Sequence, residues 1–256
     1  MRQRLFLLRE LVRRDFQARY AGSLLGFVWS FVQPLWMLLL FTFVFATVMK
    51  ISLVGERTEN FGIFLFCGLL PWTALHEGIQ RSAVSITDNA NVVKKLRFPS
   101  ELLVLAVVLT ALLHEVIAAA VFLLVLLVMG EIGWGGLPML LLILPVQVAL
   151  TLGLGLGLGA LHVFFRDIGQ ILGLVLMGWF YFTPIVYPLN LVPDSLQPLI
   201  ELNPLTALVG LYRQALLGTS PAWVDGTWTL VAASAVVLAS GLWLFRRLKP
   251  GFVDEI

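Results

Sequence analysis

The chain contains unusually few charged residues. Only 12% of its 256 residues are Asp, Glu, Lys or Arg, whereas 59% are hydrophobic and the mean hydropathy is +0.95. Soluble domains carry about a quarter charged residues. A chain of this length has too much surface for its volume to hide so many apolar side chains from water. The composition therefore predicts an integral membrane protein, and a net charge of only +2 gives no bulk electrostatic argument for nucleic-acid binding.

The chain also lacks the residues of most chemical sites. Cys67 is the only cysteine, which excludes an intrachain disulfide and a multi-cysteine metal site, and we expect it to be a small buried hydrophobe. No G-x-x-x-x-G-K-[ST] sequence occurs, so the chain has no P-loop for a nucleotide. We therefore expect no catalytic residue, metal or cofactor in this chain. Any use of ATP would require a second polypeptide that docks on it.

Six apolar segments are long enough to cross a bilayer, since a hydrocarbon core about 30 Å thick needs about 20 helical residues. The second is the weakest, because it contains Pro71 and its apolar part ends near His76. A further stretch within 189–217 is interrupted by prolines and polar residues, which is typical of two short helices that enter the membrane and return. We predict a single all-α integral membrane domain over 1–256 with spans at 27–49, 61–80, 102–129, 137–163, 168–188 and 228–246.

The positive charges fall mainly on one side of these spans. With six spans, fourteen of the seventeen Lys and Arg residues lie on the side of the N-terminus. The positive-inside rule then places both termini in the cytoplasm, and a seventh span would put Arg246 and its basic neighbours outside. Residues 1–26 contain six arginines interleaved with apolar residues at helical spacing, so we expect an amphipathic helix on the membrane interface.

Two pairs of ionisable residues lie at membrane depth, where charge is costly: His76 with Glu77, and His114 with Glu115. Neighbouring residues on a helix point about 100° apart, and neither pair has a further ligand one turn away, so neither predicts a metal or catalytic site. For Glu115 two interpretations stay open, a structural hydrogen bond to a neighbouring helix or a part in gating. The spaced glycines of 153–159 likewise suit close packing within the protomer, a dimer seam or a hinge.

Six short motifs are distributed over nearly the whole chain. They are RDFQARYAGSLLGFVW (14–29) running into Pro34, GLLPW (68–72), NANVVKKLRFP (89–99), FFRDI (164–168), TPIVYP (183–188), and NPL (203–205) followed by Tyr212 and Arg213. Each alone is a weak signal. Together and in this order they resemble the permease subunits of ABC transporters that export O-antigen, capsular polysaccharide or teichoic acid.

The resemblance implies a homodimer of six-span protomers in a bacterial cytoplasmic (inner) membrane, with two cytoplasmic ATPase subunits that bind ATP and Mg. It implies a cytoplasmic coupling helix at 83–98, external re-entrant gate helices at 189–217, and a channel lined mainly by the first and fifth spans. The cargo would be a glycan linked to undecaprenyl diphosphate. Membrane lipid is an expected partner, and nucleic acid is not.

Three groups of candidate site residues follow. Coupling to the ATPase is assigned to the coupling segment and the turn near 166: Asp88, Asn89, Asn91, Lys94, Lys95, Arg97, Phe98, Arg166 and Asp167. Aromatic residues that form interfacial belts or let sugar rings slide through a channel, with two gate residues, are Trp29, Trp36, Trp72, Trp179, Phe180, Tyr181, Tyr187, Asn203 and Pro204. Clustered arginines that could meet a lipid diphosphate head group are Arg13, Arg14 and Arg19.

Two alternative functions remain open. An ABC exporter for a drug or a small lipid would share this architecture. An integral membrane glycosyl- or acyltransferase would need a loop with clustered carboxylates, histidines or a metal site, and the longest loops hold only scattered Asp194, Glu201 and Asp225. Co-purification with an ATPase subunit would separate the enzyme from both exporters.

Overall fold

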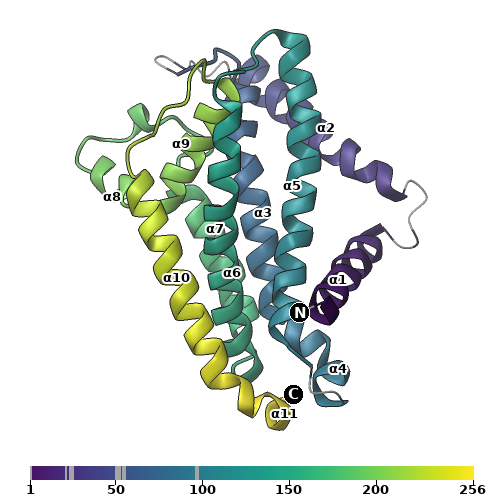
Figure 1. Ribbon diagram of the computed structural model, residues 1–256. Helices are drawn as coiled ribbons and strands as arrows, with labels where there is room; N and C mark the ends of the chain where they lie inside the picture. The colour runs from purple at the N-terminus through teal and green to yellow at the C-terminus, as the bar shows by residue number, and fades with distance from the viewer. Residues whose placement is uncertain (1, 21, 23–25, 50–52, 54–55, 96–97) are drawn as a thin grey trace.

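The computed structural model describes the chain except residues 1, 21, 23–25, 50–52, 54–55 and 96–97, and the side chains of residues 19, 20, 27, 30, 45, 46 and 95. The described part is helical and contains no strand. Four of its helices are long and apolar enough to cross a membrane: α3 (Phe61–Asp88), α5 (Glu101–Met129), α6 (Leu140–Phe164) and α10 (Thr227–Leu248). They run along the long direction of the molecule, as Figure 1 shows.

Helix α3 is the centre of the bundle. It packs against α5 and α6, and α6 packs in turn against α10. In its most apolar stretch 83% of the residues are buried, against 17% in α5, so α3 is shielded by protein to a greater extent than α5. A helix satisfies its own backbone hydrogen bonds, which allows the outward-facing side chains of α5 to be apolar in contact with lipid.

Two further apolar helices are shorter than the four long ones. Helix α2 (Trp29–Phe41) contains Pro34 and continues as a π-helical turn, η2 (Thr42–Val48). Helix α7 (Ile168–Phe182) ends six residues before the expected limit of 188. Thr183 is extended because the residue before a proline, here Pro184, disfavours helical backbone. The structure thus corrects the helical span of 168–188 to 168–182.

Helix α1 (Arg2–Tyr20) packs along α5 at the lower end of the bundle in Figure 1, and buries Leu11. The lower end also holds α4 (Ala90–Lys95), η5 (Lys249–Gly251) and α11 (Phe252–Glu255). The segment 83–98, expected to be one coupling helix, is divided instead. Residues 83–88 complete α3, Asn89 ends that helix, and α4 follows as a separate short helix.

The upper half carries the segment between α7 and α10. It contains η4 (Leu189–Leu191), α8 (Gln197–Glu201) and α9 (Pro204–Leu217). Asn203 separates the last two helices: its side-chain Oδ1 accepts from the Leu205 N–H, and Pro204 stands at the first helical position, where no backbone N–H is needed. Helix α9 packs on α3, α6 and α10 and buries most of its side chains.

The glycines of α6 serve close helix packing inside the chain. A Cβ on Gly153 would lie 2.6 Å from the backbone of Leu238 in α10, and one on Gly241 would lie 2.1 Å from the Gly153 carbonyl oxygen. On the other face of α6, a Cβ on Gly155 would meet Ser82 of α3 at 2.8 Å. Of the interpretations left open for this run, packing within the protomer accounts for these contacts.

Two apolar clusters hold the helices together. The larger lies in the upper and middle bundle and joins α3, α5, α6 and α9. The smaller lies at the lower end and includes Leu11 of α1, Val93 of α4, Phe245 of α10 and Phe252 of α11. In this lower cluster α4 packs against α11 near the C-terminus and shares the cluster with α1 near the N-terminus.

Candidate coupling and gate sites

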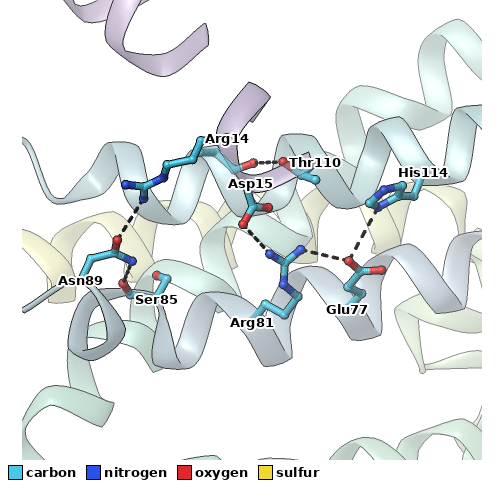
Figure 2. Close-up of polar contacts among 9 residues, drawn as sticks. Arg14, Asp15, Glu77, Arg81, Ser85, Asn89, Thr110 and His114 are labelled. Carbon is cyan, nitrogen blue, oxygen red and sulfur yellow. Dashed lines mark hydrogen bonds and ion pairs between the residues drawn. The ribbon is translucent and has the colours of Figure 1, made fainter. Parts of the chain in front are cut away.

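The junction of α3 and α4, here called the coupling corner (residues 85–95), is tied to the N-terminal helix by Asn89. The Asn89 Nδ2 donates to the Ser85 carbonyl oxygen at 2.8 Å, and its Oδ1 accepts from Arg14 Nη2 at 3.0 Å (Figure 2). Asn89 was expected to touch the ATPase and Arg14 a lipid head group. The structure joins these two side chains to each other.

A chain of ionisable groups continues from α1 into the bundle, as Figure 2 shows. The Arg81 guanidinium lies between the carboxylates of Asp15 at 2.5 Å and Glu77 at 3.0 Å. His114 Nδ1 lies 3.7 Å from the same Glu77 oxygen, and its ring stacks on Phe16 with 4.9 Å between centroids. The two membrane-depth pairs noted in the sequence therefore meet through Glu77 and His114, which sit on different helices.

The other expected coupling residues divide into exposed and packed ones. Phe98 is partly buried against the lower apolar cluster. Arg97 lies outside the described residues, as does the side chain of Lys95. The polar members on the surface of the lower end are Asp88, Asn91, Lys94, Arg166 and Asp167.

Asp88 and Arg166 both lie close enough to His162 for electrostatic interaction, so the coupling corner and the α6–α7 turn are neighbours. A groove of about 710 Å³ opens at the same end and is lined by basic residues from both ends of the chain, among them Arg4 and Arg246. The lower end therefore offers a polar, partly basic surface to a partner.

In the upper half, hydrogen bonds among Trp179, Thr183 and Asn203 join α7 to α9; this set of contacts is here called the latch. Trp179 Nε1 donates to Asn203 Oδ1 at 2.9 Å, and Asn203 Nδ2 donates to Thr183 Oγ1 at 2.9 Å. Thr183 in turn donates to the Trp179 carbonyl oxygen at 2.8 Å. Asn203 and Thr183 are buried, so the latch is shielded from solvent.

Arg213 of α9 holds the segment that follows α7. Its Nη2 donates to the carbonyl oxygens of Pro184 at 3.0 Å and Ile185 at 3.1 Å, and its guanidinium carbon lies 3.5 Å from the centre of the Phe64 ring. Such a cation over an aromatic face is attractive, most of all away from water. In the sequence, Arg213 stood out as part of the motif that follows NPL (203–205), but no partner was predicted for it. The motif TPIVYP ahead of it was the one signal that could have indicated its partner.

The aromatic candidates also divide. Trp72 is buried and packs against Phe180 at 5.4 Å between ring centres, and Trp179 belongs to the latch. Tyr187 is partly buried and donates to the Tyr181 carbonyl oxygen at 2.9 Å. Of these candidates, the aromatic side chains exposed at the surface of the chain are Trp29, Trp36 and Tyr181.

Deep in the bundle, Glu115 of α5, Gln147 of α6 and Tyr212 of α9 form a three-way contact, here called the polar ring. Each of the three is at most 4% exposed. The Tyr212 hydroxyl lies 2.6 Å from Glu115 Oε1 and 2.6 Å from Gln147 Oε1, and Gln147 Nε2 donates to Glu115 Oε2 at 2.8 Å. Of the two interpretations of Glu115, the structure contains the hydrogen bonds to neighbouring helices, through Gln147 and Tyr212.

The head-group candidates on α1 differ in availability. Arg13 is exposed, and Arg14 is exposed although it donates to Asn89. The side chain of Arg19 lies outside what the structure describes.

The chain is similar to known membrane transport proteins over nearly its whole length. Residues 7–217 match the family described as ABC-2 type transporter. The chain is 31% identical over 252 residues to the O-antigen export system permease protein RfbA of Myxococcus xanthus, covering 98% of this chain and 95% of that protein. It is 29% identical to RfbA of Klebsiella pneumoniae, covering 97% and 94%. It is 24% identical to the capsule polysaccharide export inner-membrane protein CtrC of Neisseria meningitidis, covering 94% and 90%.

Proposed function

Because this chain belongs to the ABC-2 type transporter family, we propose that it is the membrane-spanning subunit of an ATP-driven exporter of lipid-linked polysaccharide. Relatives that align over nearly their whole length export O-antigen or capsule polysaccharide, which is the single observation that carries the proposal. The sequence has no P-loop, so in this proposal ATP and Mg²⁺ would bind to a partner subunit. The permease itself performs no bond chemistry.

The proposed orientation puts the lower end and both termini in the cytoplasm. The positive-inside rule supports it, since the basic residues of 246–249 and Arg166 gather at that end. A labelling experiment tests it because Cys67, the only native cysteine, is buried and can be replaced by alanine. On that background, Ala222→Cys should react with an impermeant maleimide in intact spheroplasts, and Val253→Cys should react only after lysis. The reverse pattern would refute the orientation.

In this orientation the coupling corner and the α6–α7 turn face the ATPase. Their exposed polar residues, Asp88, Asn91, Lys94, Arg166 and Asp167, would contact it. ATP binding would draw two ATPase subunits together, and the corner would pass that movement to α3, whose lower end it continues. Through Asn89 and Arg14 the same movement would reach α1.

The proposed path lies between two protomers, whose α2 and α7 present apolar and aromatic faces. A glycan cannot cross hydrocarbon because its hydroxyl groups would lose their hydrogen bonds to water, so it needs a protein-lined corridor. The exposed rings of Trp29, Trp36 and Tyr181 would offer sugar rings flat surfaces without fixed hydrogen bonds. The undecaprenyl chain would stay in lipid, with its diphosphate near Arg13 on α1.

Deletion of the gene in its own bacterium tests the function. Surface polysaccharide should disappear while lipid-linked glycan accumulates inside, and a plasmid copy should restore export. Glycan that is never made would instead identify a synthetic enzyme. Unchanged surface glycan, with a drug or small lipid retained in the cells, would identify the other exporter class. Either result would overturn the proposal.

A further inference from the structure

If Glu115 is ionised, the polar ring has three short contacts but only two hydrogen-bond donors for them, the Tyr212 hydroxyl and the Gln147 amide. A tyrosine hydroxyl has one proton, yet the Tyr212 oxygen lies 2.6 Å from two acceptor oxygens, Glu115 Oε1 and Gln147 Oε1. If Tyr212 donates to Glu115, its contact with Gln147 has no proton, and the reverse choice leaves its contact with Glu115 without one. Two oxygens at this separation with no proton between them repel each other.

Turning the Gln147 amide does not remove the problem. Amide oxygen and nitrogen positions are assigned from hydrogen bonding, so both orientations must be considered. In the turned orientation the amide nitrogen serves Tyr212, and its oxygen faces Glu115 Oε2 at the 2.8 Å position. That oxygen pair then lacks a proton. In either orientation, one proton on Glu115 completes all three contacts.

The charged groups around the ring do not supply a counter-ion. Among the residues the structure describes, no basic side chain forms an ion pair with Glu115. His114 on the same helix faces Glu77 of α3, and Arg213 of α9 faces Phe64 and the carbonyls of 184–185.

Elsewhere, α2 carries no ionisable residue, and α6 carries none before His162 near its lower end. A cavity of about 150 Å³ is lined by Glu115, by Glu77 and by His114, which faces Glu77. A second negative charge there would be unfavourable.

From this geometry we propose that Glu115 is a neutral carboxylic acid whose proton closes the polar ring, and that it is a positioning residue that fixes α9 to α5 and α6. Its proton bonds to Tyr212, Tyr212 donates to Gln147, and Gln147 donates to the second Glu115 oxygen. The ring is then uncharged and complete, which removes the cost of a lone charge in the membrane.

Fixing α9 at Tyr212 has consequences for the end of α7. The adjacent Arg213 holds the carbonyls of Pro184 and Ile185, and Asn203 at the start of α9 holds Trp179 and Thr183. Helix α9 thus carries both the contact that fixes it to α5 and α6 and the contacts to the end of α7 and the residues that follow it. The effect on export, though not the protonation itself, rests on the proposed function.

Infrared difference spectroscopy of the purified protein tests the protonation without reference to transport. At neutral pH the wild type minus Glu115→Gln spectrum should contain the C=O stretch of a protonated carboxylic acid, displaced in D₂O. In Tyr212→Phe the band should remain but move, because the acid proton has lost its acceptor. The matched control is Glu255→Gln, an exposed carboxyl group at the C-terminus, which should leave the band in place. A carboxylate band in place of the acid band would overturn the proposal.

Export by Glu115 variants then distinguishes a neutral Glu115 from an ionised one. Gln at 115 keeps one donor and one acceptor, so Glu115→Gln should export within about twofold of wild type, whereas Glu115→Asp keeps the acidity but loses the reach and should lose roughly tenfold. Export that survives Asp and fails with Gln would overturn the proposal. Variants are compared at equal amounts of folded, membrane-inserted protein. Should the acid band be present while no glycan is exported by the wild type, the proposed function fails and the protonation stands.

Discussion

The lower and upper halves of this protein are held together by different chemistry. At the lower end, α1 is joined to α3 by ions, with Arg81 between Asp15 and Glu77, and these side chains are 21–36% exposed. In the upper half, α9 is joined to its neighbours by buried contacts, through Tyr212, Asn203 and Arg213.

The difference indicates which half is suited to move. Ion pairs that water still reaches contribute less net energy than fully buried contacts, because water stabilises the separated charges, so these partly exposed lower contacts can be exchanged at smaller cost. A buried hydrogen bond that is broken leaves an unsatisfied polar group, which costs about 1–3 kcal/mol. We infer that the ion pairs between α1 and α3 break first when a partner moves the lower end, while α9 and the end of α7 move as one rigid body.

The largest effect on this comparison is expected from Arg213→Ala. The substitution removes the cation over Phe64 and leaves two carbonyl groups without their donor, so we expect a loss of about 3 kcal/mol in stability. Lysine should not restore it, because it lacks the planar guanidinium. Thermal unfolding in detergent measures the effect, with the exposed Arg57→Ala as control. Equal stability of the two variants would show that the upper half does not depend on this residue.

An intermediate effect is expected from Asn203→Ala. It removes the acceptor of Trp179, the donor to Thr183 and the cap of α9, for which we expect about 2 kcal/mol. Asn203→Asp should recover part of this, because it keeps the acceptor and the cap but not the donor. The same unfolding assay checks the order, and Asn91→Ala on the exposed corner should change nothing. A larger loss with Asp than with Ala would contradict the assigned hydrogen bonds.

The smallest effect is expected from Asp15→Asn at the lower end. A double-mutant cycle with Arg81→Gln should give a coupling energy of about 0.5 kcal/mol, decreasing as salt is added. Glu10→Gln, on the exposed face of the same helix, is the control. A coupling energy as large as that in the upper half, or one that salt does not change, would remove the distinction between the two halves.

The sequence predicts the long helices well because their signal is local. Runs of apolar residues are visible without knowing any contact, and four of the expected spans overlap α3, α5, α6 and α10, although α3 runs on to Asp88, beyond the expected 61–80. Breaks in helices were predicted less well. Asn89 divides the segment 83–98 by bonding back to Ser85, and Pro184 ends α7 early, so each break depends on one residue.

Side-chain partners were largely beyond sequence reasoning. Glu115 was noted as costly in a membrane, with a neighbouring helix as one possible partner, but that partner is Tyr212, 97 positions away. Arg14 was assigned to a lipid head group, and its described partner is Asn89, 75 positions away. Residue spacing within one helix does not predict contacts between residues so far apart in the sequence, because these depend on which helices pack together.

Sequence alone determined that this protein is built of apolar segments suited to a membrane and that it contains no P-loop motif, because hydropathy and motif are properties of short stretches. Only the tertiary structure decided which polar groups are satisfied at membrane depth. The cost of burying Glu115 follows from its place in an apolar segment, but the groups that offset it, Gln147 and Tyr212, come from other helices and are brought there by packing.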